Sequence, residues 1–104
     1  MLSRKFTTTA CAAALAALSC GAQAQISGGS VKIGVLTDLS GTYSDLAGSG
    51  AVLATKMAID DFIANEKPNF KIEMVSADHQ NKADIASNKA REWLERENVD
   101  TVTE

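Results

Sequence analysis

The chain has 104 residues, of which 10 are basic and 13 acidic, so its formal net charge at pH 7 is −3. An acidic chain is a poor candidate for binding nucleic acid or an anionic membrane surface, so we predict neither as a partner. Without the first 24 residues the chain would have 80 residues, which is enough for one small domain.

The first 24 residues have the three parts of a secretory signal peptide. Arg4 and Lys5 precede an uncharged run rich in alanine and leucine, residues 7–18, and Ala22-Gln23-Ala24 has the small-residue pattern of a cleavage site. The apolar run is shorter than the roughly 20 residues that span a bilayer as a helix. We therefore predict cleavage between Ala24 and Gln25 and export to the periplasm.

Cys20 leaves an alternative open at this terminus. It follows Ala17-Leu18-Ser19 and precedes Gly21, which loosely resembles a lipoprotein attachment site, although alanine stands at position 17 where such sites normally carry leucine. Lipidation at Cys20 is therefore the less favoured interpretation. Cleavage after Ala24 would remove both cysteines, Cys11 and Cys20, and an exported chain without cysteine uses neither disulfides nor thiol chemistry.

The first predicted strand and helix follow a short glycine-containing lead-in. Val31 to Thr37 is apolar on both faces, which is typical of a strand inside a parallel sheet, and Gly34 within it would let a helix pack close to the sheet. A helix is predicted over roughly Ala47 to Ala64, where apolar residues recur at helical spacing. Pro68 ends it, because the residue before a proline is displaced from the helical region.

The second half of the chain repeats this order. Phe70 to Ala77 alternates apolar and charged residues at first, which indicates a half-exposed strand at the edge of a sheet. Asn81, with Asp84 three residues later, resembles a capping box, so a second helix is predicted to begin there, with Trp93 on its apolar face. A third strand is predicted from Val99 to Val102.

Strands that alternate with helices of this length indicate β-α-β units and a parallel sheet. We predict an α/β fold with helices on both faces of the sheet, as in flavodoxin-like proteins, and with the first strand between the second and the third. Ligands bind beyond the carboxyl ends of such strands. The loop from Asp38 to Gly50 and the segment from Asp78 to Asn81 should both border that crevice.

A nucleotide site and a catalytic site both fit the loop poorly. Gly48-Ser49-Gly50 begins a G-x-G pattern, but Leu53 stands where a dinucleotide fingerprint has its third glycine. His79 is the only histidine and, with Asp78, supplies at most two of the three or four ligands of a zinc site. The sequence has no G-x-S-x-G or G-K-[ST] motif. We therefore predict no cofactor, no metal and no catalytic activity.

The loop suits the binding of a small polar molecule. Ser40 offers a hydroxyl, Tyr43 offers a ring with a polar tip, and free amides at the start of the following helix favour an anion such as a carboxylate. We predict Ser40 and Tyr43 as ligand contacts, with His79 as a further candidate at the rim. The structural alternative is that the glycines only form turns and that Tyr43 packs into the core.

These segments carry a resemblance to a known family. "VKIGVLTDLSGTYSDLAGSGAVLATKMAIDDF", followed by "KIEMVSADHQNKADIASNKAREWLERENVD", resembles the start of the type I periplasmic binding proteins, in the branch of the leucine and branched-chain amino-acid receptors of ABC importers and their amide-, urea- and aromatic-acid-binding relatives. The resemblance covers essentially all of Val31 to Asp100 and includes the "SGTYSD" loop, the "KMAIDDF" helix and the "SADHQNK" segment in the family's order.

The resemblance implies a solute-binding protein with two α/β lobes that close on an amino acid or similar solute and deliver it to an ABC permease. Family members are several times longer, so residues 25–104 resemble an incomplete amino-terminal lobe that we expect not to bind solute alone. Two alternatives remain: a ligand-sensing receptor domain with the same fold, and a small exported α/β enzyme.

Overall fold

A computed structural model describes residues 26–104 of the protein. A single helical turn, η1 (Ser27–Gly29), leads into β1 (Ser30–Thr37), and the later elements are α1 (Gly48–Glu66), β2 (Lys71–Asp78), α2 (Ala83–Arg96) and β3 (Thr101–Thr103). The predicted alternation of strands and helices is confirmed. The predicted signal peptide, its cleavage site between Ala24 and Gln25, and the alternative lipid site at Cys20 lie outside the described residues.

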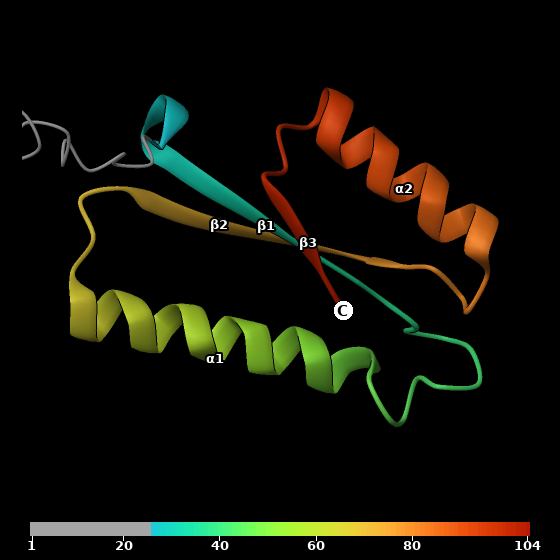
Figure 1. Cartoon of the computed structure of the whole chain (residues 1–104). Helices are drawn as coiled ribbons and strands as arrows, with labels where there is room; N and C mark the ends of the chain where they lie inside the picture. The colour runs from blue at the N-terminus through green and yellow to red at the C-terminus, as the bar shows by residue number, and fades with distance from the viewer. Residues whose placement is uncertain (1–25) are drawn as a thin grey trace, which may run out of the picture.

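The three strands form one parallel sheet in the order β2-β1-β3, so the first strand is central, as predicted (Figure 1). β1 pairs with β2 over its whole length, from Ser30 opposite Lys71 to Thr37 opposite Asp78. β3 pairs with the middle of β1, where Val35 lies opposite Thr103. Because β1 and β2 end at the same level, the loops that leave them emerge side by side at the carboxyl edge of the sheet.

The two helices lie on opposite faces of the sheet, and the α2 face holds the larger buried cluster (Figure 1). Trp93 of α2 is 3% exposed and packs with Leu36 of β1 and with Val99. Gly34 provides the necessary room, because a Cβ there would lie 2.6 Å from the Trp93 ring atoms Cε3 and Cζ3. The prediction that a helix packs closely over Gly34 is therefore confirmed.

The α1 face of the sheet is more open. Val35 is fully buried on it, but four large apolar side chains of α1 are exposed: Leu53, Met57, Phe62 and Ile63. A groove of about 490 Å³ runs between the helix and the strands, and it is lined by Ile33, Thr55, Ala58, Ile59, Phe62, Ile72, Thr101 and Thr103. No helix within residues 26–104 combines the length and the apolar character needed to cross a membrane.

The predicted capping box at the start of α2 is wrong. Gln80 and Asn81 both have left-handed backbones, with φ of 55° and 54°, and form a turn in which the Asn81 amide donates to Nδ1 of His79 at 2.9 Å. The residue that precedes the helix is Lys82, whose side chain makes no capping hydrogen bond. The turn occupies the residue expected to cap, so α2 begins at Ala83.

β3 begins later than predicted, because Val99 belongs to the turn after α2. The Val99 amide donates to the Trp93 carbonyl at 3.0 Å, and Asn98 has a left-handed backbone with φ of 54°. Asp100 then joins the chain to β1: its amide donates to the Lys32 carbonyl at 2.8 Å, and its carboxylate accepts the Lys32 amide at 2.8 Å. Val99 thus contributes to the core beside Trp93 rather than to the sheet.

Candidate functional site

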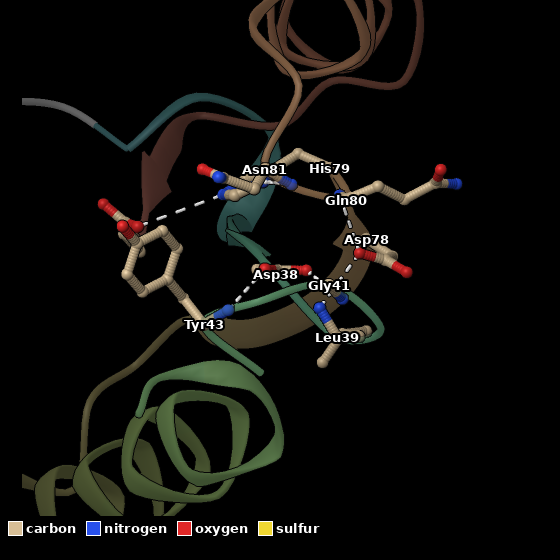
Figure 2. A network of polar contacts seen from close by, with 9 residues as sticks. Asp38, Leu39, Gly41, Tyr43, Asp78, His79, Gln80 and Asn81 are labelled. Carbon is tan, nitrogen blue, oxygen red and sulfur yellow. Dashed lines mark hydrogen bonds and ion pairs between the residues drawn. The ribbon is translucent and has the colours of Figure 1, made fainter. Parts of the chain in front are cut away.

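The β1–α1 loop, residues 38–47, is shaped by the carboxylate of Asp38. Asp38 is 2% exposed; its Oδ1 accepts the Gly41 amide at 2.6 Å and its Oδ2 accepts the Tyr43 amide at 2.9 Å (Figure 2). A Cβ at position 41 would lie 2.6 Å from both carboxylate oxygens, so only glycine lets the loop turn this tightly around Asp38. A buried carboxylate whose oxygens accept backbone amides fixes the curvature of the loop.

A second carboxylate, at Asp78 on the last residue of β2, holds the same loop to the neighbouring strand. Its Oδ1 accepts the amides of Leu39 at 2.9 Å and Gln80 at 2.8 Å, and its Oδ2 accepts the Ser40 hydroxyl at 2.5 Å. The Ser40 bond is the largest cause that lowers the pKa of Asp78, and the two backbone amides lower it further, because all three stabilise the charged form. Asp78 is therefore ionised at neutral pH.

His79 is held by its own backbone and ring at the rim of the loop. Its amide donates to the Thr37 carbonyl at 2.9 Å, and its Nδ1 accepts the Asn81 amide at 2.9 Å. A ring nitrogen that accepts an amide carries no proton, so the neutral ring bears its proton on Nε2. Nε2 lies 3.9 Å from Oε1 of Glu104, which follows β3. His79 thus lies between the segment after β2 and the end of β3.

The structure places the three sequence-predicted residues at one edge of the sheet. Ser40 and Tyr43 lie on the β1–α1 loop, and His79 lies on the segment that leaves β2. Tyr43 is 50% exposed, so the alternative that it packs into the core is wrong. The Ser40 hydroxyl donates to Asp78 and keeps its lone pairs as acceptors.

Sequence reasoning missed the roles of Asp38 and Asp78. Each aspartate stands where a strand ends, and Asp38-Leu39-Ser40-Gly41 has the aspartate and glycine spacing of a turn closed by a side chain. That signal could have identified Asp38, whose partners are local. It could not identify Asp78, whose partners Leu39 and Ser40 are 39 and 38 residues away.

The start of α1 also borders this edge of the sheet. Within residues 26–104, no group of three or more His, Cys, Asp or Glu side chains is placed to hold a metal ion. α1 begins directly after the loop, and its first backbone bond runs from the Ala51 amide to the Ala47 carbonyl at 2.9 Å. The amides before Ala51 form the positive end of the helix, which attracts negatively charged groups.

Two solved structures are similar to this chain. A periplasmic binding protein from Burkholderia mallei is 53% identical, with a TM-score of 0.63, and the match covers 71% of this chain and 20% of that one. A branched-chain amino acid ABC transporter periplasmic ligand-binding protein from Burkholderia xenovorans LB400 is 44% identical, with a TM-score of 0.62, and the match covers 69% and 19% respectively. The chain therefore spans about a fifth of the length of either structure.

A search of curated protein sequences found no match. The model of a family described as periplasmic binding proteins matches residues 30–104, from the first residue of β1 onward. This is a family of binding proteins and not of enzymes, so the enzyme alternative is wrong. Since the match includes every strand of the sheet, both flanking helices and both loops of the site, the chain belongs to the periplasmic binding protein family.

Proposed function

We propose that this chain forms the first part of the amino-terminal lobe of a solute-binding protein that captures a branched-chain-amino-acid-like solute for an ABC importer. The family match supports capture of a solute, and the similarity to the Burkholderia xenovorans protein supports the amino-acid class. The observation that carries the proposal is the β1–α1 loop: it leaves the central strand at its carboxyl end, two carboxylates hold it, and Tyr43 stands half-exposed on it.

Each part of the loop would make a different contact with such a solute. The Ser40 hydroxyl, already donating to Asp78, would accept a hydrogen bond from an ammonium group. The Tyr43 ring would cover the aliphatic side chain, beside the exposed side chains of Leu39 and Leu46. The amides at the start of α1 would favour the solute carboxylate. His79 would stay at the rim, because its Nδ1 already accepts the Asn81 amide.

The proposal includes export and a membrane partner. The basic start, apolar run and Ala22-Gln23-Ala24 pattern would direct the chain to the periplasm and leave Gln25 as the new terminus. There the complete receptor would deliver its solute to an ABC permease. Intact mass spectrometry of the exported protein tests this step, and a lipid-modified Cys20 at the terminus would contradict it.

The binding proposal is tested in a receptor that has both lobes. Residues 30–104 replace the matching segment of the Burkholderia xenovorans protein, and calorimetry measures the affinity of this chimera for L-leucine, L-isoleucine and L-valine. We expect Tyr43→Ala to weaken binding about tenfold or more, because a ring that the solute covers on binding contributes more than a single hydrogen bond. Tyr43→Phe is the matched control: it keeps the ring and loses only the hydroxyl, so its affinity should fall severalfold at most.

Two results would contradict the proposal. A chimera that binds none of the three amino acids would exclude this solute class for the segment. Equal affinity of Tyr43→Ala and the parent chimera would mean that the loop forms a turn without touching the solute.

A further inference from the structure

We propose that Asp78 is the positioning residue of the β1–α1 loop: its carboxylate fastens the loop to the segment after β2 and so sets where Ser40 and Tyr43 stand. The fastening of the loop needs no solute. The effect of this fastening on solute affinity rests on the proposed function above, so the fastening and the affinity are tested separately.

The two carboxylates of the site do different work. Asp38 bonds to amides three and five residues ahead of it, within its own loop, and therefore determines the shape of the loop. Asp78 bonds to Leu39, 39 residues away (Figure 2), and to Ser40, 38 residues away, and therefore determines the position of the loop. Loss of the first would change the curvature of the loop, whereas loss of the second would detach a loop that keeps its curvature.

Asp78 extends the pairing of two strands beyond the end of the sheet. The β1–β2 register ends at Thr37 opposite Asp78, and the last backbone bond there runs from the His79 amide to the Thr37 carbonyl. Leu39 and Ser40 come after this point. Beyond this point the Asp78 side chain replaces the backbone pairing: it accepts hydrogen bonds from the Leu39 amide and the Ser40 hydroxyl, so two more residues of the loop are bound to β2.

The carboxylate is itself held in the orientation that this role requires. The oxygen that accepts the Leu39 amide also accepts the Gln80 amide, at 2.8 Å, from the left-handed turn that follows β2. This bond holds the side chain from the β2 side, independently of the loop. An anchored loop loses less conformational entropy when a solute binds, which raises affinity without adding a contact to the solute.

The first test measures amide exchange with water in the full chain. Leucine labelled with ¹⁵N reports Leu39, which Asp78 binds, and ¹⁵N-tyrosine reports Tyr43, the only tyrosine, which Asp38 binds. We expect Asp78→Ala to speed exchange at Leu39 about tenfold or more, because it removes a charge-assisted bond, while Tyr43 stays protected. Asp84→Ala, which removes an acidic residue from the first turn of α2, is the matched control and should change neither.

Rescue by Asp78→Asn separates positioning from a general loss of structure. The asparagine oxygen can still accept the Leu39 and Gln80 amides, and its NH₂ can donate to the Ser40 hydroxyl, so Leu39 protection should return. Fast Leu39 exchange in the parent chain, or equal acceleration at Leu39 and Tyr43 in Asp78→Ala, would overturn the inference. If Trp93 emission shows that Asp78→Ala is unfolded, Ser40→Ala is the test instead, because it removes one of the two bonds through which Asp78 holds the loop. Leu39 exchange should then become faster, and an unchanged rate would overturn the inference.

The second test measures L-leucine affinity in the chimera described above. We expect Asp78→Ala to weaken binding about tenfold and Asp78→Asn to restore most of it, since a charge-assisted anchor is lost and then partly replaced. Parent affinity in Asp78→Ala would overturn the role of Asp78 in binding. A chimera that binds no amino acid would instead contradict the proposed function, and the amide test would still decide whether Asp78 holds the loop.

Discussion

The indole of Trp93 lies over the backbone of Gly34, in the space that the Cβ of any other residue would need. A Cβ at position 34 would lie 2.6 Å from two ring atoms and 3.2 Å from Cγ1 of Val99. Because Gly34 belongs to the central strand and Trp93 to α2, this contact determines how closely the helix packs on the sheet. The buried cluster of the α2 face therefore depends on the absence of one side chain.

Replacement of Gly34 by alanine should lower the free energy of unfolding by about 1–3 kcal/mol, since the added methyl overpacks the core. Urea unfolding followed by Trp93 emission measures the change. Gly50→Ala is the matched control: nothing lies within 4 Å of its Cβ position at the start of α1, and alanine favours a helix. Equal stability of the Gly34→Ala variant and the parent would contradict the close packing.

Anchoring of the β1–α1 loop should weaken in acid. The pKa of Asp78 is lowered from the ordinary value of 3.8, chiefly by the Ser40 hydroxyl, so the folded state favours the ionised carboxylate. A lowered pKa stabilises the folded state above the ordinary value, and this stabilisation is lost as the pH falls below 3.8 through the folded-state pKa. The Leu39 amide shift, followed by NMR against pH, should therefore titrate with a midpoint below 3.8.

The Asp78→Asn variant is the control for that titration, because it has no carboxylate at this position. Its Leu39 amide should show no such step. A midpoint at or above 3.8 in the parent would contradict the hydrogen bonds assigned to Asp78.

Thr37→Val should stabilise the fold by about 1 kcal/mol, because an unpaired buried hydroxyl is costly. Thr37 is fully buried at the end of β1, and among the described residues its Oγ1 has no hydrogen-bond partner. Thermal unfolding measures the change. Thr55→Val is the matched control. The Thr55 hydroxyl donates to the Ala51 carbonyl at 2.9 Å, so its removal should not stabilise the fold. A less stable Thr37→Val variant would show that the hydroxyl has a partner.

The layered part of this fold could be predicted because it depends on periodicity. A first strand apolar on both faces and a second strand polar on one face predicted a central and an edge position, and the structure has both. The turn before α2 could not be predicted in this way. Asparagine is a common helix-capping residue. Here, however, the Asn81 amide donates to the His79 ring, and because Gln80 and Asn81 both have left-handed backbones, the helix begins only after them.

The candidate site was predicted only in its exposed part. Hydroxyl and aromatic residues in a loop after the central strand indicate where a ligand could bind, and Ser40 and Tyr43 were found in this way. The residue that holds them, Asp78, is distant in sequence, and its role depends on the parallel register that brings the ends of β1 and β2 together. No local sequence pattern reveals which residues of β1 and β2 lie opposite one another.

The parallel register has a consequence for the order in which the chain folds. No strand can pair through a hairpin: β1 meets β2 between positions about 41 residues apart, as in Ser30 and Lys71, and meets β3 between positions about 68 apart, as in Ile33 and Thr101. Closing a longer loop costs more entropy, and β3 contributes only three residues in return. The pairing of β1 with β2 should thus nucleate the sheet, and β3, whose end brings Glu104 toward His79, should dock last.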